Sequence, residues 1–271
     1  WMRPAARLDA AELPAATKVG LAQEAALLYL VTQDTAYADF AFAVLRSFLA
    51  DGSKRQLIPY LASEFTELPV ERSAVGMAFG ITFDWCYNAW TPEHRAVVRQ
   101  AIEEALNVWP CIGHKGLESP FDTPPFGAFR GAELVMTLAI GQESTRGKRF
   151  GQLRRWLLAH VESGYSESGL APTGAEVDVA GAFVLPAAYA LLDVGDSDLV
   201  KSVARRSWWK LAMIADLMVE TQVASDIPHA GWRNLLFPSV PREYVPYYRW
   251  VYDHRLGRDA SVPSYEGAQG G

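Results

Sequence analysis

A short segment late in the sequence gathers an acid, a histidine, an aromatic ring and a cation. It reads Asp226-Ile227-Pro228-His229-Ala230-Gly231-Trp232-Arg233. His229 can give or take a proton near neutral pH. Trp232 can stack on the face of a sugar ring, and Arg233 can hold a carboxylate through two parallel hydrogen bonds. The alternative is an exposed loop that Trp232 anchors to the core.

Metal and nucleotide sites have little support in the sequence. No HExxH, CxxC or carboxylate-rich loop occurs, and neither does a GxGxxG or P-loop segment. We therefore expect no metal and no cofactor. The five histidines are widely spaced along the chain: His94, His114, His160, His229 and His254.

Composition narrows the class of protein. Half of the 271 residues are hydrophobic, so the chain can bury a large core. The 25 basic and 31 acidic residues give a net charge of −6, which argues against nonspecific binding to nucleic acid or to an anionic membrane. An acidic substrate would need a local basic pocket. The two cysteines, Cys86 and Cys111, provide no disulfide framework, and no apolar run is long enough to span a membrane.

Apolar residues recur at helical spacing through most of the chain, and no segment indicates a strand. Leu21, Ala25 and Leu28 form such a stripe, and Thr91-Pro92-Glu93 combines a cap, a first-turn proline and an acid at a helix start. Adjacent Trp208 and Trp209 point in different directions on a helix, so we expect at least one of them in the core. The predicted helices cover residues 15–31, about 40–49, 70–89, 92–110, 128–140, 149–163, 178–193, 198–220 and 242–255.

Three long connections separate these helices, at residues 110–126, 164–177 and 222–241. Loops of this length in a compact domain often carry function. Successive helical hairpins predict either an α-solenoid or a ring of paired helices, because each hairpin buries one face only against its neighbour. Clear sequence repeats are missing, which favours the ring.

Three groups of residues resemble the heparinase II/III-like and alginate-lyase-like proteins. The first is Leu21-Ala22-Gln23-Glu24-Ala25-Ala26-Leu27-Leu28-Tyr29-Leu30-Val31-Thr32-Gln33-Asp34, followed by Tyr37-Ala38. The second is Gly80-Ile81-Thr82-Phe83-Asp84-Trp85-Cys86-Tyr87 with Thr91-Pro92-Glu93-His94-Arg95. The third is Ser168-Gly169-Leu170-Ala171-Pro172-Thr173-Gly174 leading into Phe183-Val184-Leu185-Pro186-Ala187-Ala188.

The resemblance implies an all-α fold, an incomplete (α/α) toroid of antiparallel helical hairpins. It implies a toroid domain over residues 1–255 and a linker or tail over 256–271, with the family's usual β-sandwich domain absent from this chain. The activity implied is β-elimination on an acidic, uronate-containing polysaccharide by a secreted or periplasmic lyase. The chain starts at Trp1, so we also expect a processed product or a piece of a longer chain.

The same resemblance assigns roles to individual residues. The family places an Asn or His that neutralises the substrate carboxylate near residues 126–133, where this chain offers Arg130. The alternative is an exposed pair between Arg130 and Glu133 at i, i+3 spacing. The family's tyrosine base falls near Tyr165, and Glu176 and Asp178 follow it. These two acids can instead cap the next helix.

The sequence therefore predicts one site with several open alternatives. The candidate catalytic residues are His229, Arg130, Glu176 and Tyr165, and the candidate substrate-binding residues are Glu133, Asp178, Trp232, Arg233 and Trp85. A noncatalytic carbohydrate-binding or scaffold domain is a second hypothesis. A toroidal glycoside hydrolase is a third, with two carboxylates drawn from Glu133, Glu176, Asp178 and Asp226.

Overall fold

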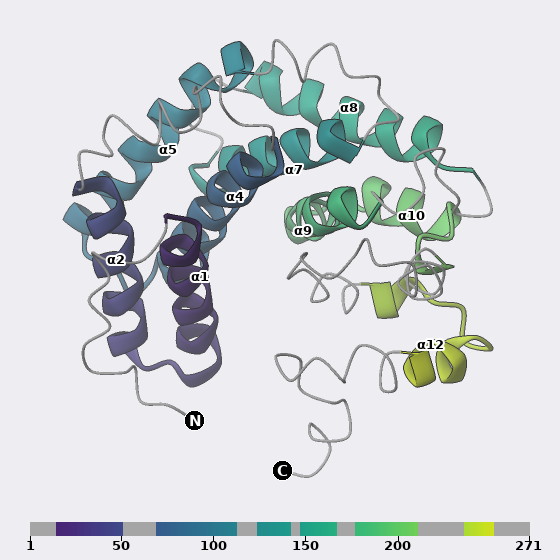
Figure 1. Cartoon of the computed structure of the whole chain (residues 1–271), viewed down its shortest axis with the longest axis horizontal. Helices are drawn as coiled ribbons and strands as arrows, with labels where there is room; N and C mark the ends of the chain where they lie inside the picture. Colours follow the sequence, from purple (N-terminus) through teal and green to yellow (C-terminus); the bar gives the residue numbers. More distant parts are fainter. Residues whose placement is uncertain are drawn as a thin grey trace. The chain divides into compact units, whose positions relative to one another are not determined.

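A computed structural model describes residues 15–50, 69–112, 124–141, 147–166, 177–210 and 236–251 (Figure 1). Most of the described residues are helical, and the described ranges contain no strand, which confirms the all-α prediction. No helix within them is long and apolar enough to cross a membrane. The chain divides into two compact units, 1–118 with 131–153 and 119–130 with 154–271, and each is considered by itself. The predicted tail at 256–271 lies outside the described residues.

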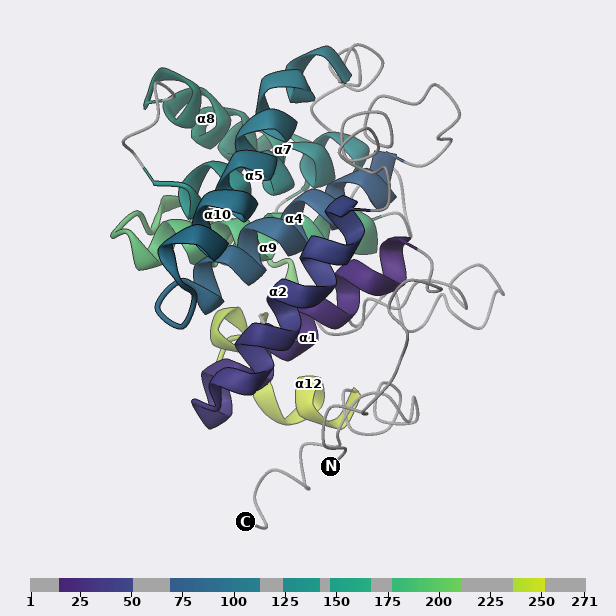
Figure 2. The same ribbon diagram turned by 90° about the vertical axis from the view of Figure 1, so that its left-hand side faces the viewer.

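The first unit opens with the hairpin that the sequence predicts. Helices α1 (Ala15–Thr32) and α2 (Thr35–Ala50) run antiparallel and pack together (Figures 1 and 2). Gln33 makes the turn with a φ of 58°, and the Asp34 carboxylate accepts a hydrogen bond from the Ala36 N–H at 3.0 Å. This bond satisfies a backbone donor at the start of α2.

A second hairpin pairs α4 (Pro69–Cys86) with α5 (Pro92–Ile112). The predicted cap is confirmed, since the Thr91 hydroxyl accepts a hydrogen bond from the His94 N–H at 3.2 Å. The predicted end at Pro110 is wrong, because α5 continues to Ile112. A proline removes its own donor and strains one turn, but it does not always end a helix within that turn.

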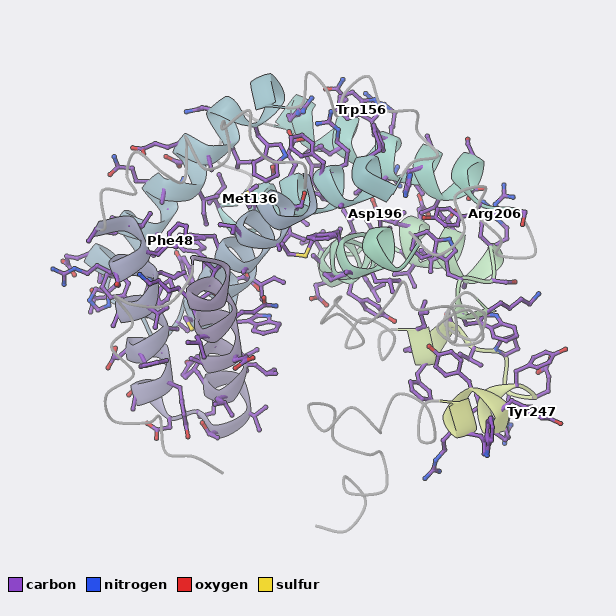
Figure 3. All side chains as sticks on the ribbon, in the orientation of Figure 1. Phe48, Met136, Trp156, Asp196, Arg206 and Tyr247 are labelled. Carbon is purple, nitrogen blue, oxygen red and sulfur yellow. The ribbon has the colours of Figure 1, made fainter. Side chains whose placement is uncertain are left out.

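A long-range hydrogen bond and close packing at a glycine hold these helices together. The buried Trp90 indole donates a hydrogen bond to the Ala38 carbonyl at 2.8 Å, which ties the turn after α4 to α2. Helix α7 (Pro124–Ala139) contributes its residues from 131 onward to this unit. A Cβ on Gly80 of α4 would lie 3.2 Å from the Cα of Met136, so glycine permits the close approach of α4 to α7 (Figure 3).

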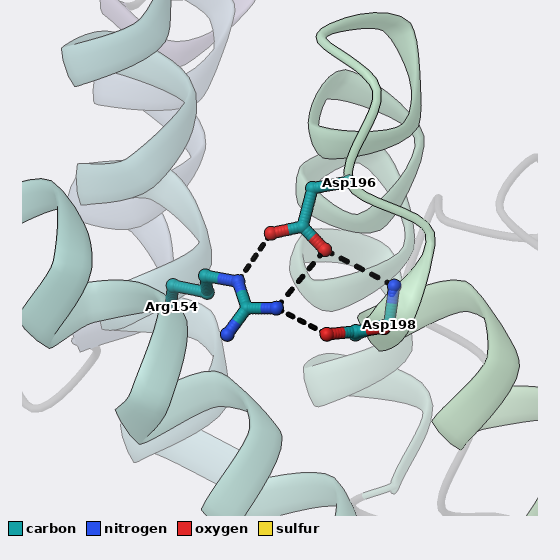
Figure 4. Close-up of polar contacts among 3 residues, drawn as sticks. All are labelled: Arg154, Asp196 and Asp198. Atoms are coloured by element: carbon teal, nitrogen blue, oxygen red, sulfur yellow. Dashed lines mark hydrogen bonds and ion pairs between the residues drawn. The ribbon is translucent and has the colours of Figure 1, made fainter.

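The second unit contains the first half of α7, the second half of α8 (Gly147–Gly164), α9 (Val177–Asp193), α10 (Asp198–Arg205) and α12 (Val245–Val251). Ion pairs join α8 to the region around the start of α10. The Arg154 guanidinium binds the carboxylates of Asp196 and Asp198, and the Asp198 N–H donates to Asp196 at 3.1 Å (Figure 4).

The single helix predicted over residues 198–220 is wrong. Helix α10 ends at Arg205, a turn follows in which Ser207 has a φ of 54°, and the chain is helical again at 209–210. Side chains of neighbouring residues on a continuous helix point about 100° apart. The turn instead lets Trp208 and Trp209 both reach the core, where both are buried.

Candidate functional site

Arg130 is the centre of the strongest candidate site, and it lies in the second unit. Its side chain, which projects from α7, has no exposed surface. The guanidinium carbon lies 4.5 Å from the ring centre of Trp156, 5.1 Å from that of Phe129 and 5.6 Å from that of Phe126. The negative faces of aromatic rings attract a cation, so these rings stabilise the buried positive charge.

His160, on α8, joins the same group of rings. Its imidazole is fully buried, and its ring centre lies 5.9 Å from that of Phe126. A Cβ added to Gly127 would lie only 2.4 Å from His160 Nε2. The imidazole therefore reaches the backbone of α7 at a position that only glycine leaves open.

Tyr165 follows α8 and packs edge-on against His160, with ring centres 5.5 Å apart and an angle of 88° between the rings. On its other side it contacts the indole of Trp208 at 4.5 Å. Burial raises the pKa of the Tyr165 hydroxyl, because the phenolate would lose its solvation. The hydroxyl thus stays protonated at neutral pH, which suits a proton donor better than the base that the family resemblance implies.

We call this group the Arg130 cluster. It combines a guanidinium, an imidazole and a protonated phenol inside a shell of aromatic rings. Trp156, which covers the guanidinium, is partly exposed, so the cluster reaches the protein surface at this ring (Figure 3). The members of the cluster are Phe126, Gly127, Phe129, Arg130, Trp156, His160, Tyr165 and Trp208.

Glu133, a predicted substrate ligand, belongs to the first unit and is fully buried. Its carboxylate accepts a hydrogen bond from Arg149 Nε at 2.6 Å, and Arg149 Nη1 donates to Gln152 at 2.9 Å. The alternative of an exposed pair between Arg130 and Glu133 is wrong, because neither side chain reaches solvent. The charge of Glu133 is matched by Arg149, and this ion pair holds α8 against α7 within the first unit.

The remaining predicted residues lie in the first unit or have no described side chain. Trp85 is half-buried on α4 of the first unit. Asp178 is the second residue of α9, inside the helix and not before it, so its position is favourable to the helix dipole but is not that of a cap. Four predicted site residues lie outside the described residues, and so does Asp226: Glu176, His229, Trp232 and Arg233.

Sequence spacing did not point to His160. It was one of five scattered histidines, and the sequence pattern around it predicts only an ordinary helix. The glycine at 127, facing it from another helix, is the feature that could have drawn attention to a close contact. Within the described ranges, no group of three or more His, Cys, Asp or Glu side chains is arranged to hold a metal ion.

Comparisons with known proteins found no match, so the assignment of a function rests on the fold and on the Arg130 cluster. No protein-family model matches the chain, and neither the curated proteins nor the solved structures that were searched contain a match.

Proposed function

We propose that the chain binds a uronate-containing polysaccharide at the Arg130 cluster and cleaves it by β-elimination. The proposal includes an incomplete (α/α) toroid of helical hairpins and a secreted or periplasmic location. One observation carries it: Arg130 and His160 both pack against Phe126, and His160 packs against Tyr165, so the three polar side chains belong to one aromatic group of the second unit. These three side chains match the three roles that elimination across a uronate requires.

Each role follows from the chemistry of the side chain. The guanidinium of Arg130 pairs with the uronate carboxylate and stabilises the negative charge that develops beside it. The imidazole of His160 takes the proton from the carbon next to that carboxylate. The released electron pair forms a carbon–carbon double bond, the glycosidic carbon–oxygen bond breaks, and Tyr165 gives a proton to the leaving oxygen.

The contact between His160 and Tyr165 completes the cycle. After the reaction the imidazole carries one extra proton and the phenol lacks one. The two rings pack edge-on with centres 5.5 Å apart. The proposal therefore returns the proton from His160 to Tyr165 after the leaving group departs, which restores both groups. No water is consumed, which separates this reaction from hydrolysis.

Burial of the three polar side chains favours a second candidate, a noncatalytic carbohydrate-binding or scaffold domain. Arg130 and His160 have no exposed surface, and Tyr165 is also buried. In that case the three polar groups fix the packing of α7 on α8 and touch no substrate. A glycoside hydrolase has weaker support. The Glu133 carboxylate is already paired with Arg149, and the other proposed acids have no described side chain.

An ultraviolet assay tests the elimination directly. The protein is incubated with alginate, polygalacturonate and a neutral glucan, and absorbance of the conjugated unsaturated uronate is recorded. We expect a rise with a polyuronate only, and Tyr165→Phe should lower the rate by about 10² to 10⁴ because it removes the proton donor but keeps the ring. Arg155→Ala, at an exposed arginine of α8, is the control that should keep the rate.

Two outcomes would contradict the elimination. New reducing ends without the absorbance would indicate hydrolysis, and polyuronate binding without any cleavage would indicate the noncatalytic domain. His229→Ala belongs in the same series, because the predicted role of His229 as acid or base is not resolved by the described residues.

A further inference from the structure

Helix α12 presents aromatic side chains to solvent. Its anchor is Tyr248, which is buried and packs edge-on against Phe237 with ring centres 4.8 Å apart. Tyr244, Tyr247 and Trp250 are 45%, 65% and 55% exposed. Tyr247 and Trp250 lie three residues apart on α12, so their Cα atoms are displaced by about 4.5 Å along the helix axis, and Tyr244 lies in the turn just before the helix. We call these three residues the aromatic ledge; Figure 3 labels Tyr247 on it.

One end of the ledge is held in place by the core of the second unit. The ring of Tyr244 stacks on the buried Trp209, with ring centres 5.0 Å apart and an angle of 30° between them. The Tyr244 carbonyl also accepts a hydrogen bond from the Tyr248 N–H at 2.9 Å, which continues the helical pattern back to Tyr244. A ring fixed before binding loses little conformational entropy when a ligand stacks on it.

The chemistry of the exposed side chains indicates a carbohydrate. The strongly exposed large apolar side chains between residues 236 and 250 are Tyr244, Tyr247 and Trp250, and each has an apolar face and a polar tip. By contrast, α1 exposes the aliphatic side chains of Leu27, Leu30 and Val31. The ledge thus offers what a sugar ring stacks on, a flat apolar face beside hydrogen-bonding groups.

Basic residues lie beside the ledge in the described part of the second unit, although the chain as a whole carries −6. Lys210 Nζ lies 5.5 Å from the ring centre of Trp209, the indole on which Tyr244 stacks. Arg242 precedes Tyr244 by two residues and is exposed, and Glu243 is the one acidic residue in the described segment 236–251. This local excess of positive charge complements an acidic ligand.

We propose that the aromatic ledge is a second carbohydrate site, made of residues other than the Arg130 cluster, that holds an acidic oligosaccharide. Sugar rings stack on Tyr247 and Trp250, and Lys210 and Arg242 attract the carboxylates. The choice of an acidic sugar rests on the proposed function, while the choice of a carbohydrate rests on the ledge itself. The site retains the polymer on the protein without taking part in bond cleavage.

Binding to polygalacturonate, measured by titration calorimetry or affinity electrophoresis, tests the ledge. The double variant Tyr247→Ala with Trp250→Ala should bind about tenfold more weakly or worse, because two stacking faces are lost. Tyr87→Ala is the matched control, since Tyr87 is a 44% exposed tyrosine of the first unit. We expect the control to bind as the unaltered protein does, and the double variant to keep the same thermal unfolding midpoint.

Charge and partner class are tested with the same proteins. Replacing both Lys210 and Arg242 by Gln should weaken binding to polygalacturonate more than to a neutral glucan, and equal weakening would overturn the acidic ligand. Unchanged polygalacturonate binding by the ledge variant would overturn the site. So would a loss confined to anionic lipid vesicles or to self-association, which would assign the ledge to a membrane or to a second copy of the chain.

Failure of the ledge and failure of the elimination give different results. If only the elimination is wrong, the protein and its Tyr165→Phe variant bind polygalacturonate equally, the ledge variant binds weakly, and no unsaturated uronate forms. If only the ledge is wrong, unsaturated uronate forms and the ledge variant binds as the unaltered protein does.

Discussion

Arg130 shows how a single charged residue can occupy the core. Removing a guanidinium from water is costly unless other groups stabilise its charge. Phe126, Phe129 and Trp156 supply ring faces at 4.5 to 5.6 Å from its central carbon. A lysine is a poor replacement, because its compact and strongly hydrated ammonium cannot lie flat against these rings.

Replacing Arg130 by methionine separates a structural role from a binding role. Methionine keeps a long apolar side chain against the rings but removes the charge and the planar fork that can pair with a carboxylate. We therefore expect Arg130→Met to keep the helical far-ultraviolet spectrum and to weaken binding of short oligouronates far more than binding of neutral oligosaccharides. Equal losses for both sugars would exclude an electrostatic role, and Arg155→Met, at an exposed site, is the control.

Gly127 is a second residue whose effect can be measured. In Gly127→Ala the new Cβ must displace His160, from which it would be only 2.4 Å distant. Such overpacking typically costs about 1–3 kcal/mol. Chemical denaturation should show this loss, and the displaced imidazole should also lower any elimination rate.

Gly20→Ala is the matched control for that substitution. Gly20 lies within α1, and a Cβ there would meet nothing within 4 Å. Alanine in a helix is more stable than glycine by roughly 0.5–1 kcal/mol. A stabilised Gly20→Ala protein beside a destabilised Gly127→Ala protein would confirm the contact, and two stabilised proteins would contradict it.

Among the elements of the second unit, α8 and α10 are joined by charges on both sides of their contact. Glu162 on α8 accepts hydrogen bonds from the Ser202 hydroxyl and from Arg205, and one from Arg206 Nη2 at 3.1 Å. About two turns earlier on α8, Arg154 binds Asp196 and Asp198 (Figure 4). The two networks fix α10 along α8 at both of its ends.

These networks predict that stability falls in acid. The Arg154 hydrogen bond lowers the pKa of Asp196, and the Ser202 hydrogen bond lowers that of Glu162. A carboxyl with a depressed pKa in the folded state stabilises the fold above its unfolded pKa, which is about 4, and this contribution is lost as the pH falls through the folded value. Thermal unfolding followed from pH 7 downward should therefore show a steep loss below about pH 4.

Asp196→Asn tests the origin of that acid dependence. The amide cannot ionise, so the variant should be less stable than the unaltered protein at neutral pH, and the difference should shrink as the pH falls. Asp39→Asn, at an exposed carboxylate of α2, is the control and should leave the curve unchanged. Parallel curves for the Asp196→Asn variant and the unaltered protein would show that this ion pair does not cause the acid sensitivity.

The whole chain consists of two compact units that share two helices in sequence. Helices α7 and α8 each contribute residues to both units. The Arg130 cluster and the aromatic ledge consist of residues of the second unit, and the ion pair of Glu133 with Arg149 belongs to the first. We thus expect variants of the cluster and of the ledge to leave the packing of the first unit intact.

Circular dichroism tests the architecture of the entire chain, including the residues that the structure does not describe. Helical hairpins over most of residues 1–255 should give a far-ultraviolet spectrum dominated by helix. A spectrum dominated by a β signal would contradict the all-α assignment for the chain. The same spectra should coincide for the cluster and ledge variants, which would show that their binding losses do not come from unfolding.

The sequence by itself determined where most of the helices lie. Helical periodicity and caps such as Thr91 depend on residues within a few positions of one another, so the sequence contains the information directly. The hairpin of α1 and α2 follows from the same local pattern and from the turn at Gln33 and Asp34. The choice of Arg130 and Tyr165 as candidate site residues came instead from the family resemblance.

Only the tertiary structure decided which side chains are buried and which of them meet. The break after α10 arises at Ser207, where the turn allows two consecutive indoles to enter the core. His160 joins the site because Gly127, from another helix, leaves room for its ring. Charged Arg130 and Glu133 are buried rather than exposed because Trp156 and Arg149 of α8 stabilise them. Such partners are far away in sequence, and no local pattern specifies them, since burial of a charge depends on what the folded chain places beside it.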